Sequence, residues 1–231
     1  MADSSKFIES VFDKLPNWTG YPVFKELFMD DKSSPIYLSG GVLRNTIMGN
    51  RYKTKDYDFF ITGNDFEIKL KELEKYGNVF TTPYGAPRWF PKNSNIYADL
   101  MPISSFSPGL WPCSDIIDVL NQFDFTMNAL AIELNTQKIF DPVNGMRDAS
   151  QKVLKMVRFD YPVGPFIPEQ KIDRNAILWI RAIHYTSKYH LRIEPITLSW
   201  IKKNKHFKDS IPLFSDIFFK PEKQFLLEGI I

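Results

Sequence analysis

The sequence predicts an α+β fold, in which a head with a mixed β-sheet and flanking helices precedes a small all-helical domain. In the first 150 residues, short apolar and β-branched runs alternate with amphipathic helical patterns, whereas helical spacing dominates afterwards. The turn-rich stretch DPVNGMRD at 141–148 separates the two patterns. We therefore expect a head over residues 1–150, including N-terminal helices, and a helical domain over residues 151–231.

The head is predicted to combine short strands with surface helices. Apolar and β-branched runs place strands at 36–41, 57–63, 77–82, 95–101 and 128–134. Apolar residues at helical spacing place helices at 5–14, 22–29, 42–49 and 65–76. The order along the chain is therefore strand, helix, strand, helix and then further strands, after two N-terminal helices.

The second domain is predicted mainly from the stretch IDRNAILWIRAIHYTSKY at 172–189. Ala176, Ile180 and Ile183 share one face of a helix at this spacing, and Asp173 is a candidate N-cap. Residues 196–204 and 220–228 also have helical patterns.

Composition and charge exclude several classes of protein. A net charge of +2 excludes a strongly basic nucleic-acid coat, although it leaves room for a local basic groove. The single cysteine, Cys113, excludes an internal disulfide, and no Cys/His cluster has zinc spacing. No signal-peptide pattern and no apolar run of about 18 residues is present, so we expect a cytoplasmic protein without a membrane span.

Three features that carry chemistry lie close together in the sequence. Gly40 and Gly41 follow a predicted strand and open a helix, and Arg44 lies on its first turn. Backbone N–H groups at a glycine turn and a helix N-terminus bind anions such as phosphates, and an arginine adds a bidentate contact. Asp56 and Asp58 begin the next strand, where residues two apart share a face.

Paired carboxylates of this kind suit hard divalent cations, so Asp56 and Asp58 are predicted to bind two Mg²⁺ ions, for which Mn²⁺ could substitute. Two such ions, about 3.5–4 Å apart, activate an attacking hydroxyl and stabilise a leaving pyrophosphate. Asp99 is the candidate third acid, because it interrupts an otherwise apolar strand pattern. Taken singly, a glycine pair is usually a turn and a lone Asp-x-Asp is usually structural, so the prediction depends on their combination.

These residues resemble a known family. GGVLRNTIMG at 40–49 followed by KDYDFF at 55–60 is similar to the pattern of the DNA polymerase β-type nucleotidyltransferase superfamily, and most similar to its CCA-adding tRNA nucleotidyltransferases and bacterial poly(A) polymerases. Three later segments resemble the same group: DFTMNALAIEL at 124–134, IFDPVNGMRDASQKVLKMV at 139–157, and IRAIHYTSKYHLRIEP at 180–195. The last resembles the first helix of the family's helical neck domain.

The resemblance implies roles for the residues of the first two segments. Gly40, Gly41 and Arg44 match the triphosphate-binding turn. Asp56 and Asp58 match the catalytic carboxylates that bind metal.

The resemblance also implies roles for residues further along the chain. Asp99 falls where the third catalytic and metal-binding acid is expected. Asp124 matches an acid that contacts the ribose of the nucleotide, and Asn128 matches an amide of the same segment. Arg181 matches a neck arginine near the nucleotide.

The chain departs from the family pattern at several positions. Asn45 replaces an aspartate, and Gln122 and Phe123 replace two arginines. The family selects C or A through a Glu-Asp-x-x-Arg template in the neck. The positions of Glu, Asp and Arg in that template are held here by Arg174, Asn175 and Leu178.

The resemblance therefore implies a metal-dependent enzyme that transfers a nucleoside monophosphate from an NTP, ATP or CTP, to the 3′ end of RNA, with tRNA as the expected acceptor. Because the base template is replaced, transfer to a protein or a small molecule is an alternative. A catalytically silent nucleotide- or RNA-binding module is a further alternative. The segment Arg88-Trp89-Phe90 lies on a predicted strand or loop near the site, where it could stack a base or pack in the core.

Overall fold

A seven-stranded mixed sheet forms the centre of the head, as shown by the computed structural model, which describes residues 4–30, 34–49, 54–106, 110–166, 169 and 171–229. The strands are β1 (Ile36–Ser39), β2 (Asp56–Ile61), β3 (Gly77–Thr81), β4 (Pro87–Pro91), β5 (Tyr97–Pro102), β6 (Ala131–Glu133) and β7 (Ile139–Phe140). Their order in the sheet is β3-β4-β5-β2-β1-β6-β7. Only β2 and β5 pair in parallel, so the sheet is mixed, as predicted.

Helices cover both faces of this sheet. The head helices are α1 (Ser4–Phe12), α2 (Tyr21–Phe24) with its π-helical continuation (Lys25–Met29), α3 (Gly41–Ile47), α4 (Phe66–Leu73), α5 (Ile116–Leu120) and α6 (Gly145–Ser150). One face packs on α1 to α4 through a core that includes Trp18, Phe59 and Trp89. The other face packs on α5 through Phe60 and Val119, but only over part of its width.

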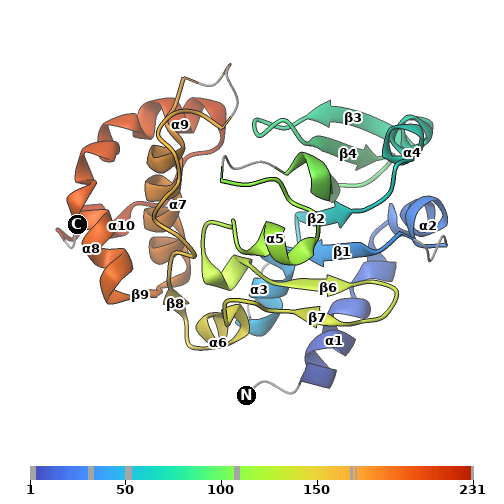
Figure 1. The fold of residues 1–231 in the computed structure, drawn as a ribbon, viewed down its shortest axis with the longest axis horizontal. Helices are drawn as coiled ribbons and strands as arrows, with labels where there is room; N and C mark the ends of the chain where they lie inside the picture. The colour runs from blue at the N-terminus through green and yellow to red at the C-terminus, as the bar shows by residue number, and fades with distance from the viewer. Residues whose placement is uncertain are drawn as a thin grey trace.

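The second part of the chain gathers beside the head as a helical layer, drawn in orange and red in Figure 1. Its helices are α7 (Arg174–Tyr189), α8 (Pro195–Lys203), α9 (Ile211–Ile217) and α10 (Gln224–Leu227), and a 3₁₀ helix (Lys205–Ser210) joins α8 to α9. Asp173 caps α7 as predicted, because its side chain accepts a hydrogen bond from the Asn175 N–H at 2.7 Å. A small parallel sheet of β8 (Val153–Leu154) and β9 (Arg192–Ile193) adds to the predicted helices.

The two parts share a core near the predicted boundary. Phe125, Met127 and Ala149 pack with the residues of α7 although they precede residue 150. The boundary near residue 150 stays a prediction, and the packing shows that the DFTMNALA segment serves the helical part as well as the sheet.

Most predicted elements are present with shifted ends. The predicted strand over 128–134 shortens to β6, because residues 126–128 form a 3₁₀ turn that buries Thr126 and Asn128. The RWF segment forms β4, with Trp89 in the core. Among the described residues, no helix is long and apolar enough to cross a membrane.

Candidate active site

The carboxylates Asp56 and Asp58 project from one face of β2. Alternation along the strand turns Tyr57, which lies between them, into the opposite core, where it is 2% exposed. The parallel pairing of β2 with β5 places Asp58 directly beside Asp99. The structure therefore brings together the three acids that the sequence singled out.

The Gly40–Gly41 turn lies against the same acids. Gly40 has φ +74° and ψ −140° and is the residue before α3, and Ser39 pairs with Asp58 across β1 and β2. A Cβ atom at Gly40 would overlap the Oδ2 atom of Asp58. Gly40 is thus required both by its positive φ and by the close approach of the carboxylate.

The charge of Asp58 is poorly compensated within the protein. Burial, followed by the charges of Asp56 and Asp99, raises its pKa well above the usual value, although the Gly41 N–H and the Arg181 charge oppose this. Clustered carboxylates that repel one another are stabilised by a cation. The oxygen donors of Asp56 and Asp58 have the chemistry that a hard divalent cation prefers.

Asp99 is engaged differently from the other two acids. The Arg88 guanidinium on β4 donates from Nε to Oδ1 at 2.6 Å and from Nη2 to Oδ2 at 2.8 Å. Burial still raises the pKa of Asp99, with Asp56 adding to the effect against Arg88. Within the described residues, no group of three or more His, Cys, Asp or Glu side chains is placed to hold a metal ion, so metal binding by Asp99 stays a prediction.

Arg44 lies beneath the glycine turn and is only 4% exposed. Its guanidinium donates to Asn128 Oδ1 at 2.7 Å, to the Tyr189 hydroxyl at 2.9 Å, and to Asn45 Oδ1 at 3.1 and 3.2 Å. It also lies 4.8 Å from the ring centroid of Tyr185. Arg44 therefore joins the head to α7, and its predicted phosphate contact stays a prediction.

Asp124 and Arg181 form an ion pair across the same junction. Arg181 donates to Asp124 Oδ2 from Nε at 2.9 Å, and its Nη2 lies 2.7 Å from the same oxygen. The other oxygen of Asp124 accepts from Asn128 Nδ2 at 2.9 Å. Arg44, Asn128, Asp124 and Arg181, four of the predicted nucleotide-binding residues, thus belong to one connected network.

Three tyrosines complete this junction, and no local sequence pattern identifies them. Tyr185 and Tyr189 lie on α7, and the Arg44 guanidinium is 4.8 Å from the centroid of each ring. Tyr84, at the tip of the β3–β4 hairpin, packs on Phe166 and Phe218 with ring centroids 5.4 and 5.1 Å apart. The hairpin tip points toward the helical part in Figure 1. Their roles become visible only once the position of the β3–β4 turn relative to the helical part, and the face of α7 that meets the head, are known.

The residues that depart from the family pattern have structural roles here. Gln122 is 2% exposed and bonds the Trp111 backbone through both its donor and its acceptor. Phe123 packs on Phe60 and Phe106. These two positions, where the family has arginines, therefore stabilise the segment before the DFT motif.

The residues at the positions of the family's base template also make structural contacts, here within the helical part. Arg174 donates from Nη2 to the Pro165 carbonyl at 2.6 Å, and Leu178 is 3% exposed in the core. The Asn175 backbone N–H donates to the Asp173 side chain that caps α7, and its side-chain amide donates to the Tyr161 carbonyl at 3.5 Å. The family's base template therefore has no equivalent at these three positions.

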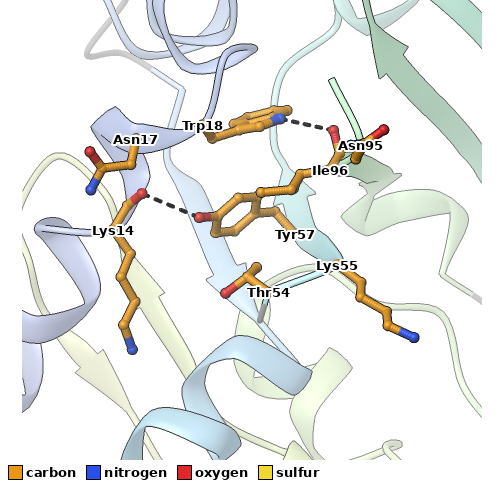
Figure 2. A pocket seen from close by; sticks show the side chains of 8 residues that line it. All are labelled: Lys14, Asn17, Trp18, Thr54, Lys55, Tyr57, Asn95 and Ile96. Carbon is orange, nitrogen blue, oxygen red and sulfur yellow. Dashed lines mark hydrogen bonds between the residues drawn. The ribbon is translucent and has the colours of Figure 1, made fainter. Parts of the chain in front are cut away.

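A cavity of about 490 Å³, whose lining side chains are drawn in Figure 2, includes Tyr57 and therefore lies on the opposite face of β2 from Asp56 and Asp58. The Trp18 indole N–H donates to the Ile96 carbonyl at 3.0 Å beside it, and the Tyr57 hydroxyl donates to the Lys14 carbonyl. The cavity is lined by Lys14, Asn17, Trp18, Thr54, Lys55, Tyr57, Asn95 and Ile96. Asp56, Asp58 and Asp99 are not among these lining residues, so the cavity is separate from the acid site.

Comparisons with known proteins find similar sequences. The family model described as the poly A polymerase head domain matches residues 101–155. The A-adding tRNA nucleotidyltransferase of Aquifex aeolicus is 26% identical over 72% of this chain and 20% of its own length. The CCA-adding enzyme of Lactobacillus helveticus is 27% identical over 83% of this chain and 46% of its own length. The chain thus spans less than half the length of either relative.

Solved structures show the same fold. A Thermotoga maritima CCA-adding enzyme complexed with tRNA aligns with a TM-score of 0.60 and 23% identity, over 82% of this chain and 43% of that one. A CCA-adding enzyme in complex with CTP aligns with a TM-score of 0.61 and 23% identity, over 88% and 46% of the two chains. The predicted head and neck architecture is therefore confirmed. In sequence and in fold, the chain is therefore similar to the nucleotidyltransferases of the CCA-adding enzyme and poly(A) polymerase group.

Proposed function

We propose that this protein transfers a nucleoside monophosphate from an NTP, ATP or CTP, to the 3′-hydroxyl of an RNA, with tRNA as the expected acceptor and pyrophosphate as the product. One observation carries the proposal. Asp56 and Asp58 share a sheet face beside the Gly40–Gly41 turn, and the charge of Asp58 is left undercompensated by the protein. A site of this kind is stabilised by the cations that phosphoryl transfer requires.

Asp56 and Asp58 would hold two Mg²⁺ ions, or Mn²⁺ in their place, through carboxylate oxygens. When bound, the metal supplies activation of the attacking hydroxyl and neutralisation of the charge on the leaving pyrophosphate. Gly40 leaves the space that the Asp58 carboxylate occupies, and the Gly41 N–H orients that carboxylate. Asp99 is proposed as the third acid. To bind metal, it would have to lose the contact between Arg88 and at least one of the Asp99 carboxylate oxygens.

The junction network is proposed to form the wall of the nucleotide site. Asp124 presents a carboxylate that is 12% exposed and that Arg181 and Asn128 hold in one orientation. A fixed carboxylate of this kind accepts hydrogen bonds from ribose hydroxyls. Arg44 supports the wall from beneath through its contact with Asn128.

The relatives support an RNA acceptor. Their names describe tRNA nucleotidyl transfer, and related structures are described with tRNA, CTP or ATP. We propose a cytoplasmic location as well, with which the free, buried thiol of Cys113 is compatible. The preferred base is left open by the replaced template.

The proposal is tested by incubating the protein with each labelled NTP, Mg²⁺ or Mn²⁺, and total RNA. We expect label to enter RNA with the wild type and not with Asp58→Asn. The matched control is Asp65→Asn, because Asp65 lies at the start of α4 in an ion pair with Lys69 and away from the acids. This variant should retain the transfer.

The fate of the label separates the alternatives. Label in protein or in a small product, with none in RNA, would favour nucleotidylation of another acceptor. The absence of label in every fraction, together with NTP binding that does not depend on Mg²⁺ in calorimetry, would favour a silent binding module and contradict the proposal.

A further inference from the structure

Three aromatic side chains form a continuous row on the sheet face that carries the acids. Phe80 lies on the edge strand β3, Phe90 on β4 and Tyr97 on β5. The ring centroids of Phe80 and Phe90 are 5.7 Å apart, and those of Phe90 and Tyr97 are 5.0 Å apart. We call these three residues the aromatic stripe.

Strand register fixes the stripe on the same face as the acids. Tyr97 pairs with Asp56 across β5 and β2. Arg88 pairs with Asp99 on one side and with Phe80 on the other. Because directly paired residues point to the same side of a sheet, the stripe and the acids share one face.

The outer end of the stripe is open to solvent. Phe80 is 56% exposed, although an exposed aromatic on an edge strand favours aggregation. Phe90 and Tyr97 are partly exposed, whereas the neighbouring Trp89 on the opposite face is fully buried. The exposure thus increases with distance from the acids, as in a platform that leads toward them.

The inner end of the stripe contacts the acid site directly. The Tyr97 hydroxyl donates to Asp56 Oδ2 at 3.2 Å. The Arg88 guanidinium lies 4.0 Å from the Tyr97 ring centroid while it pairs with Asp99. The stripe therefore combines exposed rings with a cation and ends at the carboxylates.

We propose that the aromatic stripe binds the single-stranded 3′ end of the acceptor RNA and delivers it to Asp56 and Asp58. Exposed rings next to an arginine are the combination on which successive bases of a single strand stack. Because stacking tolerates any base, one row of rings can guide RNA ends of different sequence into the same site. This inference rests on the proposed function and names the surface that its acceptor would use.

The test measures binding of two labelled RNA hairpins in Mg²⁺ by fluorescence anisotropy. One hairpin carries a four-nucleotide 3′ overhang and the other is blunt. We expect the wild type to bind the overhang hairpin more tightly. Phe80→Leu keeps an apolar side chain but removes the ring, so it should raise the Kd for the overhang hairpin about five- to tenfold and leave the blunt hairpin unchanged.

Two further variants control for the chemistry of the substitution. Phe80→Trp keeps a ring and should restore the wild-type preference for the overhang. Phe159→Leu removes another exposed phenylalanine, 40% exposed in the helical part, and should leave both Kd values unchanged. Because Phe80 is exposed, neither change at that position is expected to unfold the protein.

Steady-state transfer separates the RNA from the incoming nucleotide. We expect Phe80→Leu to raise the KM for RNA and to leave the KM for the NTP unchanged. A raised KM for the NTP alone, equal losses for both hairpins, or no effect of Phe80→Leu would each overturn the inference. Overhang binding that depends on Phe80 without any transfer would instead count against the proposed function.

Discussion

The acid site on β2 and the polar junction with α7 both contain charged side chains in partly buried positions, but their charges are balanced differently. At the junction, Asp124 is paired with Arg181 and also accepts from Asn128. At the acid site, Asp58 lies between two further acids, and its pKa is raised well above the usual value by burial and by those charges. The charges of the junction are therefore balanced by the protein itself, whereas those of the acid site repel one another.

This difference separates two roles among the predicted site residues. Residues whose hydrogen bonds and charges are already satisfied hold the structure in one arrangement. Residues whose charges repel cost stability and are retained where chemistry requires them. Substitutions in the acid site, the junction and the helical part test this difference.

The largest effect is expected from Asp58→Asn. Losing one of the two carboxylates proposed to bind metal should reduce nucleotidyl transfer by about a thousandfold or more, because a bound metal would supply several kcal/mol of charge stabilisation. Without metal, the same change should raise the melting temperature, because it removes a repelling charge. Thermal unfolding with and without Mg²⁺ measures this, and a less stable metal-free variant would contradict the comparison.

A smaller effect is expected from Arg181→Met. This change leaves the carboxylate of Asp124 without its cation, and it should lower the free energy of unfolding by about 3 kcal/mol. The matched control is Arg158→Met, since Arg158 pairs with an Asp160 side chain that is 62% exposed, and such pairs contribute less than about 1 kcal/mol. Equal decreases in the free energy of urea unfolding for the two variants would show that the Arg181–Asp124 pair stabilises the protein no more than an exposed pair does.

His184 on α7 provides a test based on pH. Burial, then the charges of Lys188 and Arg181, lowers its pKa to about 3, and its Nδ1 accepts from the Glu222 N–H at 3.0 Å. In the unfolded chain His184 takes up a proton near pH 6.5, whereas in the folded protein it stays neutral down to about pH 3. The free energy of unfolding is therefore highest above about pH 6.5 and falls as the pH drops toward 3.

Between pH 7 and pH 5, the wild type should lose about 2 kcal/mol more stability than His184→Gln. Urea unfolding at both pH values measures the difference. The same substitution at the exposed His206 is the matched control and should follow the wild type. Parallel pH dependence of the wild type and His184→Gln would mean that His184 accepts a proton without disturbing the helical part.

The smallest effect compares Gly40→Ala with Gly49→Ala. Both glycines have positive φ, but a Cβ atom at Gly49 meets nothing within 4 Å, whereas one at Gly40 overlaps Asp58. Gly49→Ala should cost about 1 kcal/mol for its backbone alone, and Gly40→Ala should cost about 1–2 kcal/mol more. Equal costs in urea unfolding would mean that Asp58 moves away easily.

Several site features were predictable because each depends on one short segment. Asp56 and Asp58 alternate on one strand, the glycine pair lies between a strand and a helix, and Asp173 precedes a helical pattern. The partnership of Arg88 with Asp99 was not predictable, since it requires the register of β4 on β5. The aromatic stripe likewise depends on three strands being placed side by side.

The α+β architecture, the glycine turn and the positions of the acids follow from the sequence alone, because local periodicity and turn chemistry act over a few residues. Which charges are balanced depends instead on the folded arrangement. Arg44 reaches Tyr189 and Arg181 reaches Asp124 across the junction, whereas Asp58 meets Asp99 across the sheet. Electrostatic energies depend on distance and burial, and folding sets both of these by bringing together residues that are far apart in the chain.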